Sequence, residues 1–394
     1  MTHRERILAA IRGERPDRLP WVPRLEFWHR AAVRQGTLPP DLRSLSLEEI
    51  TERLGVGCYS SVPDFTDATR SDAMLDRGLG IFHLPVLPYR VTLQDVERRV
   101  VRSGRETVVE YHTPRGTLRT ATVFTEEMLD AGASISWIVE HALREPGDFD
   151  VAGHIFSHLK VEPQLHGYLA RRDALCERGL AVGYLLGTAC PMQHIMKELM
   201  PLEQFFYVLH DEPARIERLT EQMEPLYQQI KEIGANSPAE VIFLGGNYDD
   251  SITYPAFFEK HILPPLRDYA AVLHAKAKYL MTHTDGENKQ LLELYLRAGF
   301  DIADSVCPYP MTRCRLEEIR AAFADRITIW GGIPSTLLCA TSTPDDEFRR
   351  SVDQLVRRYE GESHFILGVS DMVTADADWK RLQHITEMVN SPPH

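Results

Sequence analysis

The sequence predicts an α/β fold, a closed (β/α)8 TIM barrel of eight parallel strands, and three observations carry this prediction. The chain has 394 residues, of which 43% are hydrophobic, enough to bury one large core. Short apolar runs recur along it, and most are followed by a helix-length segment, the pattern of parallel β/α units. The G-x-G-x-x-G loop typical of an open, doubly wound sheet is absent from the sequence, which favours the closed barrel.

The first elements are short and bounded by turn residues. Thr2 can cap a helix that continues through Arg6–Ile11. The first strand is expected at Leu19–Leu25, between prolines, and the amphipathic segment Glu26–Gln35 is expected to form the helix after it. Val56–Val62 is expected to be the second strand.

The pattern changes between residues 82 and 123, where apolar and polar residues alternate with a period of two. Residue pairs that favour turns occur at Ser103-Gly104 and Arg115-Gly116. We therefore expect an antiparallel β-hairpin insertion after the second strand, covering the barrel as a lid or rim.

Beyond the insertion, residues 135–175 have a helical pattern, and six further apolar runs follow it. The last helix is expected at Ala377–Val389. With the two early runs, the six complete a set of eight strands in a single domain spanning residues 1–394. The six runs are Leu180–Leu186, Val241–Leu244, Tyr279–His283, Phe300–Val306, Ile327–Trp330 and His364–Val369.

Composition excludes several classes of partner. A net charge of −13 and the absence of a basic stripe argue against nucleic acid. The first fifteen residues do not resemble a signal peptide, and no uninterrupted apolar stretch is long enough to span a bilayer, so we expect a cytoplasmic protein without a membrane partner. Six cysteines are too few in so long a chain for a disulfide framework.

His283 and Asp285 are the first candidate catalytic and metal-binding residues. They end the apolar run Tyr279–His283 and lie two positions apart, so on a strand both side chains leave the same face. The carboxyl end of a barrel strand is where such enzymes place catalytic groups and metals. A histidine with a carboxylate suits a divalent metal such as zinc, and without metal the same pair can act as an acid/base and its orienting partner.

Three further residues are candidate metal ligands. Asp371 follows the last strand in phase with its inner face, and we expect it to point toward the same mouth as His283. Glu287 lies close to the His283 pair in sequence, and Cys307 closes the neighbouring strand; the alternative for Cys307 is a buried structural thiol.

Polar loops after the other strands are candidate substrate contacts. Asn247 and Asp249 are in phase in the loop after the fourth strand, where they would orient a substrate, and Asp249 is the third candidate catalytic residue. The segment Gly331–Ser335 follows the seventh strand, a place where barrels often expose backbone N–H groups to an anion. The predicted substrate-binding residues are Arg24, Asp64, Tyr184, Asn247, Trp330, Gly331 and Gly332.

Four segments together resemble the uroporphyrinogen decarboxylase superfamily. They are Glu5–Pro20, Tyr111–Leu118, His283–Gly286 and Ile319–Ile333, and the likeness extends over nearly the whole chain. The resemblance implies a (β/α)8 barrel. It also implies one of two activities, haem-pathway decarboxylation or corrinoid-linked methyl transfer to a thiol.

The resemblance also assigns roles to residues. The decarboxylases carry an N-terminal signature whose arginines bind substrate carboxylates, and here only Arg24 stands in for them. The methyltransferase branch has a His-x-Cys zinc pair at the fifth strand and a second cysteine after the eighth. These positions correspond to His283, Asp285 and Asp371, so both cysteines have become carboxylates.

Three hypotheses follow. The first is a metal-assisted, methyltransferase-like enzyme that acts on a small-molecule or corrinoid-bound methyl donor, with a corrinoid protein as partner and a homodimer as a further expectation. The second is a metal-independent decarboxylase of a uroporphyrinogen-like tetrapyrrole or another carboxylate, in which Arg24 receives the carboxylate and His283 or Asp64 manages the proton. The third is a non-catalytic barrel that binds a tetrapyrrole or a corrinoid.

Overall fold

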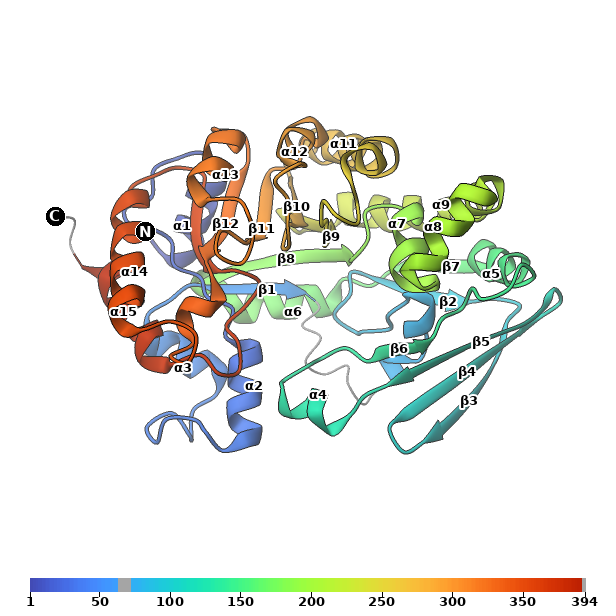
Figure 1. The fold of residues 1–394 in the computed structure, drawn as a ribbon, viewed down its shortest axis with the longest axis horizontal. Helices are drawn as coiled ribbons and strands as arrows, with labels where there is room; N and C mark the ends of the chain where they lie inside the picture. Colours follow the sequence, from blue (N-terminus) through green and yellow to red (C-terminus); the bar gives the residue numbers. More distant parts are fainter. Residues whose placement is uncertain (63–71, 392–394) are drawn as a thin grey trace.

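A seven-stranded parallel sheet forms the centre of the computed structural model, which describes residues 1–62 and 72–391 (Figure 1). The sheet curls into a half-barrel, with strand order β1-β8-β9-β10-β11-β12-β13. Five of its strands are buried along their whole length, as expected for a parallel sheet covered on both faces. The strands are β1 (Cys58–Val62), β8 (Gly179–Leu186), β9 (Val241–Gly246), β10 (Tyr279–His283), β11 (Ile302–Val306), β12 (Thr328–Ile333) and β13 (Phe365–Val369).

Seven of the eight predicted strands are therefore confirmed, and the first, Leu19–Leu25, differs. Only Trp21 forms an isolated parallel bridge there, to Leu367 of β13. Pro20 and Pro23 lack the N–H group that a continuous ladder needs, which explains why no strand forms. The closed eight-stranded barrel stays a prediction.

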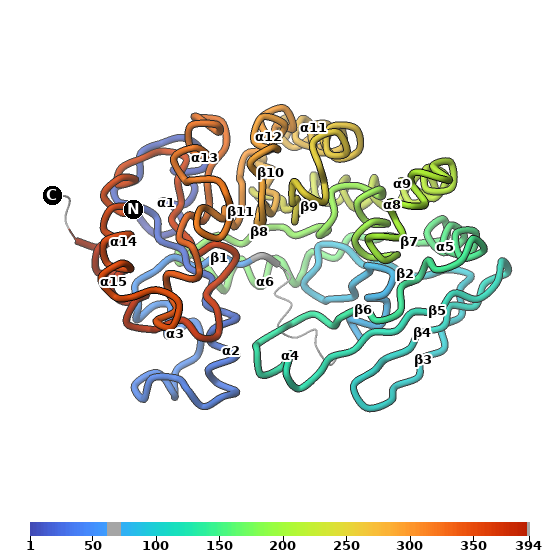
Figure 2. Tube along the Cα trace, in the orientation of Figure 1, coloured from blue at the N-terminus to red at the C-terminus, as the bar shows by residue number. Residues whose placement is uncertain are grey.

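The segment around Trp21 nevertheless lies between the two ends of the sheet. Leu367 donates its backbone N–H to Pro20 O and accepts from Val22 N, while Gly57, just before β1, donates to Trp21 O. The amino-terminal segment thus runs beside the carboxyl-terminal strand (Figure 2).

Helices connect and cover the parallel strands. The predicted amino-terminal helix forms with Thr2 as its N-cap in a capping box, and the helix at Glu26–Gln35 has the predicted bounds. The main helices are α1 (His3–Ile11), α2 (Glu26–Gln35), α3 (Leu47–Leu54), α4 (Glu126–Asp130), α5 (Asp148–Ser157), α6 (His166–Leu175), α7 (Pro191–His194), α8 (Leu202–Asp211), α9 (Pro213–Asn236), α10 (Pro255–Phe257), α11 (Leu263–His274), α12 (Leu292–Ala298), α13 (Leu316–Phe323), α14 (Asp345–Tyr359) and α15 (Trp379–Asn390).

Short helical turns of other types complete the set. Two are π-helical turns that continue an α-helix, and the rest are 3₁₀ turns. They are η2 (Asp72–Met74), η3 (Arg77–Leu79), η4 (Cys176–Arg178), η5 (Ile195–Leu199, π), η6 (Phe258–Ile262, π) and η7 (Ser335–Leu338). None of the described helices is long and apolar enough to cross a membrane.

The antiparallel insertion between β1 and β8 is larger than predicted. Instead of one hairpin over residues 82–123, it contains a four-stranded sheet, β3-β4-β5-β6, and a separate two-stranded ribbon, β2-β7. The four-stranded sheet, here called the rim sheet, projects away from α14 and α15 (Figure 1). The strands are β2 (Tyr89–Leu93), β3 (Glu97–Ser103), β4 (Glu106–Thr113), β5 (Gly116–Val123), β6 (Trp137–Glu140) and β7 (Leu159–Pro163).

Residues 135–175 were predicted to be helical. The prediction is correct where α5 and α6 form, and wrong where the chain forms the strands β6 and β7. Both strands pair with partners that precede them by many residues, β6 with β5 and β7 with β2. Pairing across the fold thus overrides the local pattern, because a strand is stabilised by its neighbours more than by its own composition.

Asp76 anchors the rim sheet to the rest of the chain. Its fully buried carboxylate accepts from Arg98 of β3 at 2.7 Å and from the Tyr111 hydroxyl of β4 at 3.0 Å. His83 contributes a third contact at 2.5 Å. A buried carboxylate needs such partners, so these contacts fix where the rim sheet sits.

Candidate functional site

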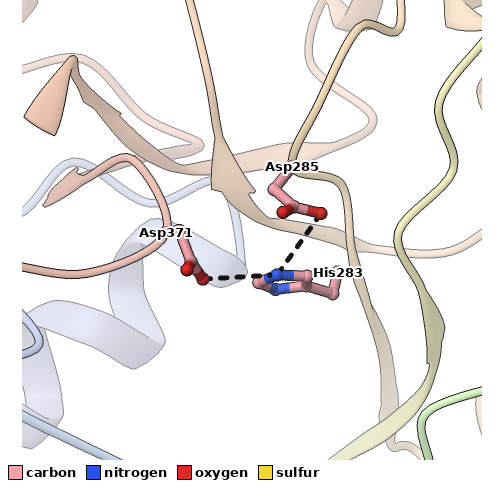
Figure 3. A group of neighbouring side chains, drawn as sticks. All are labelled: His283, Asp285 and Asp371. Carbon is pink, nitrogen blue, oxygen red and sulfur yellow. Dashed lines mark ion pairs between the residues drawn. The ribbon is translucent and has the colours of Figure 1, made fainter. Parts of the chain in front are cut away.

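Three candidate residues converge at the carboxyl ends of β10 and β13. His283 is the last residue of β10, Asp285 follows two positions later, and Asp371 lies just beyond β13. The imidazole Nε2 is 3.5 Å from Asp285 Oδ1 and 3.4 Å from Asp371 Oδ1 (Figure 3). One ligand atom from each of the three residues lies within 4.8 Å of the others.

The local backbone explains this convergence. The ladder between β10 and β9 is irregular between Met281 and His283, and that between β11 and β12 is irregular around Ser305, whose φ is 60°. Irregularities of this kind re-aim side chains beside active sites. Asp371 also has a positive φ, 58°, and its carbonyl accepts from Ser305 Oγ at 3.3 Å, so the turn after β13 is held against β11.

Asp304 orients the imidazole from the other side. This residue of β11 is 2% exposed, and its carboxylate is 2.8 Å from His283 Nδ1. A carboxylate on Nδ1 keeps the proton there and leaves Nε2 facing Asp285 and Asp371. Asp304 was not predicted from the sequence, although an acidic residue inside the apolar run Phe300–Val306 is a signal that could have identified it.

The charges around His283 shift its pKa strongly. Burial lowers it, but the hydrogen bonds to Asp304 and Asp371 and the charge of Asp285 outweigh burial and raise the pKa of His283 to about 10. Burial opposes the ionisation of Asp371, yet the contact with His283 lowers the pKa of Asp371 to about 2. Burial raises the pKa of Asp285. Without metal, the imidazole is therefore a cation among carboxylates.

Arg24 is the nearest positive side chain on the Asp371 side. Its Nη1 is 3.7 Å from Asp371 Oδ1 and 3.4 Å from the Asp371 carbonyl, and its guanidinium lies 5.3 Å from the ring centroid of Tyr59. Burial lowers the pKa of Arg24, but the charges of Asp304 and neighbouring groups raise it overall. Arg24 therefore lies beside Asp371, and its role in substrate binding stays a prediction.

Asn247 and Lys197 support Asp285. Asn247 Nδ2 donates to Asp285 Oδ1 at 2.8 Å, and Lys197 Nζ donates to Asn247 Oδ1 at 3.2 Å. Asn247 has a φ of 54°, a conformation that asparagine tolerates better than most residues. Lys197 lies in the π-helical turn η5, and burial lowers its pKa. Lys197 was not predicted from the sequence, because no local pattern marks a π-helical turn.

The three side chains fit a divalent metal. Ligand bonds of about 2.1 Å in a tetrahedral site place ligand atoms about 3.4 Å apart. Two of the three separations, 3.5 Å and 3.4 Å, match that spacing. Asp304 supplies the carboxylate that usually supports a metal-binding histidine. One nitrogen and two oxygens suit zinc or another borderline metal, with a coordination position left open.

The two additional candidate ligands have other partners. Glu287 accepts from Arg313 N and forms an ion pair with Arg313 Nε at 3.0 Å. The Cys307 thiol lies 3.7 Å from Met311 Sδ, and burial raises the pKa of this thiol to about 11. Within residues 1–62 and 72–391, the group of side chains that could hold a metal contains neither Glu287 nor Cys307.

Asp249, the third candidate catalytic residue, is bound into its own loop. Its carboxylate accepts from the backbone N–H groups of Ser251 at 2.9 Å and Glu287 at 3.2 Å. These contacts join the loop after β9 to the loop after β10, so the observed contacts of Asp249 are structural. Its catalytic role stays a prediction.

The remaining predicted substrate contacts are spread over the parallel sheet. Tyr184 stacks on Phe243, with ring centroids 5.1 Å apart, and Trp330 packs edge-on against Tyr59, with centroids 4.9 Å apart. Both are buried residues of the sheet.

The two predicted glycines of β12 lie where backbones and side chains pack closely. A side chain at Gly331 would meet the backbone of Val306, and one at Gly332 would meet Leu316 and Phe365. Asp64 lies outside the described residues.

Comparison with solved structures supports the fold. A methyltransferase from Methanosarcina mazei matches with a TM-score of 0.51 at 12% sequence identity, covering 99% of this chain and 98% of that chain. At this identity the likeness concerns the fold alone. Among curated proteins, no match was found.

The family model for uroporphyrinogen decarboxylase (URO-D) matches residues 188–392. The matched region is more than half of the chain and carries β9 to β13, and with them His283, Asp285, Asp304 and Asp371. The chain belongs to the uroporphyrinogen decarboxylase family.

Proposed function

We propose that this chain is a metal-assisted enzyme of the methyltransferase-like branch of its family, acting on a small-molecule or corrinoid-bound methyl donor. One observation carries the proposal: His283 Nε2 and the carboxylates of Asp285 and Asp371 lie within 4.8 Å of one another at strand ends. Under this proposal, the segment Pro20–Val22 occupies the place of the eighth barrel strand. Its backbone hydrogen-bonds both to Leu367 of β13 and to Gly57, just before β1.

Each residue of the site has a distinct task. His283 Nε2, Asp285 and Asp371 would hold a divalent metal, with zinc as the first candidate. The metal, when bound, supplies a Lewis acid that lowers the pKa of an acceptor group. Asp304 keeps the Nδ1 proton of His283 in place, so that Nε2 stays available as a donor atom.

Neighbouring groups position the substrate in the proposed mechanism. Arg24 stands beside Asp371 and offers a cation to an anionic substrate group. Asn247 holds Asp285 in place, and Lys197 holds Asn247 in turn. The rim sheet would limit the access of water to the mouth.

The test of metal binding is elemental analysis of protein purified without added metal. We expect about one divalent metal per chain in the wild type and a loss of at least tenfold in occupancy in His283→Ala and Asp371→Asn. The variant Asp301→Asn is a matched control, because Asp301 also pairs with a histidine, His274 at 2.9 Å, but at the opposite end of β11. Metal-free wild type that also fails to take up zinc would refute the proposal.

The test of the reaction uses methylcobalamin as donor and a set of thiol acceptors. Methyl transfer that depends on added zinc and is lost in His283→Ala would support the proposal. Transfer that is unaffected by a chelator would contradict the role of the metal.

A second candidate function is metal-free decarboxylation, and the raised pKa of His283 favours it. With a pKa of about 10, His283 is protonated at neutral pH and can act as a general acid, while Arg24 receives a carboxylate. Incubation of chelator-treated protein with uroporphyrinogen and related carboxylates tests this candidate. Release of carbon dioxide would favour it over the metal-assisted reaction.

A further inference from the structure

A second cavity lies outside the His283 site, between helices α13 and α14. Its volume is about 820 Å³, and neither His283, Asp285 nor Asp371 lines it. The loop after β11, the turn after β12 and one side of α14 form its walls. Its apolar surface comes from Leu316, Leu337 and Leu355 with three prolines, Pro308, Pro310 and Pro334.

Two hydroxyl groups in the cavity wall lack hydrogen-bond partners within the described part of the chain. They belong to Tyr359 and Thr336, two residues of the cavity wall, and both oxygens are shielded from solvent. Tyr359 is 2% exposed. Buried polar groups are normally hydrogen-bonded, but these two oxygens have almost no accessible surface, so a ligand in the cavity does not reach them.

Positive charge borders the same cavity. The Arg315 guanidinium lies 5.9 Å from the ring centroid of Tyr309 and forms no ion pair with any described residue. Arg358 has one weak pair, with Glu362 at 3.6 Å. The first turn of α13 begins at Leu316 in the cavity wall, and the positive end of a helix favours an anion.

Two carboxylates also border the cavity and restrict the kind of ligand. Glu317 and Glu347 are both exposed. They disfavour a ligand with several negative charges, because like charges repel at this distance. A single negative charge on a mostly apolar molecule is compatible with all of these groups.

We propose that this cavity binds a small organic carboxylate with an apolar body. The carboxylate pairs with Arg315 and Arg358, and the body packs on the leucines and prolines. The proposal gives a role to Gly332, which lines this cavity and which the sequence analysis assigned to anion binding after the seventh strand. It does not depend on the function proposed for the His283 site.

The cavity wall also contacts the loops of the His283 site. Tyr309 and Pro310 form the cavity side of the loop after β11. Arg313 of the same loop forms ion pairs with Asp250 at 2.9 Å and with Glu287 at 3.0 Å. A ligand in the cavity therefore lies against the segment that holds the loops after β9 and β10.

Isothermal titration calorimetry of the full chain with 4-phenylbutyrate tests the proposal, with 4-phenyl-1-butanol as the uncharged comparison. We expect the acid to bind and the alcohol to bind at least tenfold more weakly. Loss of one charged contact weakens binding by about tenfold, so Arg315→Gln should raise the Kd by that factor and Arg315→Gln with Arg358→Gln by more. Arg357→Gln is the matched control, because Arg357 is the neighbouring arginine of α14 but does not line the cavity.

Two further variants locate the binding site. Ser351→Phe places a ring in the cavity from α14 and should abolish binding, with circular dichroism to check that the variant folds. Leu355→Ala, which removes part of the apolar wall, should weaken binding if Ser351→Phe does not fold. Asp371→Asn, at the His283 site, should leave binding unchanged. Equal affinity for acid and alcohol, no binding at all, or a loss of binding in Asp371→Asn would overturn the proposal.

Discussion

The two ring nitrogens of His283 have different partners, and this difference decides what the site can do. Nδ1 faces the buried carboxylate of Asp304 at 2.8 Å, and Nε2 faces Asp285 and Asp371. A proton held on Nδ1 leaves Nε2 with two alternatives, a second proton or a metal. The same geometry therefore supports both proposed functions, and the occupant of Nε2 distinguishes them.

Replacing Asp304 by asparagine should weaken metal binding without removing a proposed ligand. The change removes the negative charge that supports His283, and losing such a supporting group typically lowers metal affinity by about 10- to 100-fold. Zinc titration against a chromophoric chelator measures the effect. The control Asp301→Asn removes the other His–Asp pair of this strand and should leave zinc affinity unchanged. An equal loss in both variants would show that general destabilisation is the cause.

The raised pKa of His283 predicts how the stability of the metal-free protein depends on pH. The folded-state pKa, about 10, lies above the ordinary value of 6.5, so the contribution of His283 is full below pH 6.5 and is lost as the pH rises through about 10. Urea denaturation of chelator-treated protein should show the free energy of unfolding of the wild type approaching that of His283→Gln over this range. A constant difference between the two proteins would contradict the assigned contacts.

At the scale of elements, one buried carboxylate joins the rim sheet to the turn that precedes it. Asp76 is fully buried and joins η3 to β3 and β4 through Arg98 and Tyr111. The rim sheet also packs against α5 through β4 and β5, and the ribbon strand β2 is tied to β8 by a hydrogen bond from the Tyr89 hydroxyl to Leu185 O. The contacts of Asp76 are thus a buried polar part of a larger packed interface.

Asp76→Ala should loosen the rim sheet while the parallel sheet stays folded. Removing one partner of a buried ion pair lowers the free energy of unfolding by about 3 kcal/mol or more. We expect the lower value here, because Arg98 is partly exposed. Hydrogen exchange should show lost protection in β3 and β4 and unchanged protection in β9 and β12. Asp72→Asn is the control, since Asp72 pairs with Arg102 at the surface. Unchanged exchange in Asp76→Ala would remove the proposed anchor.

At the scale of the whole molecule, regular strands were predictable and irregular backbone was not. The apolar runs identified β1 and β8 to β13, because strands of a buried parallel sheet are continuous in hydrophobicity. Prolines beside Trp21 prevented a strand there, and β6 and β7 depend on partners far away in sequence.

The site was predictable to the same degree. His283 and Asp285 follow from a period of two at a strand end. Asp371 lies near them, but its φ of 58° means that it does not continue the alternation of β13. Its position depends instead on the turn that is held by the hydrogen bond from Ser305 Oγ. Asp304 and Lys197 were missed, because their partners are brought together only by the fold.

Metal binding should stabilise the folded chain, because the proposed ligands come from two strands of the sheet that are not neighbours. His283 and Asp285 extend from β10, while Asp371 follows β13, the strand that carries the amino-terminal bridge at Trp21. A ligand that binds only the folded state at 100 times its Kd raises the free energy of unfolding by about 2.7 kcal/mol. Guanidinium denaturation of chelator-treated protein, with and without zinc, should show this increase in the wild type and not in Asp371→Asn. An equal increase in both proteins would mean that zinc binds elsewhere, because the carboxylate of Asp371 connects β13 to the site.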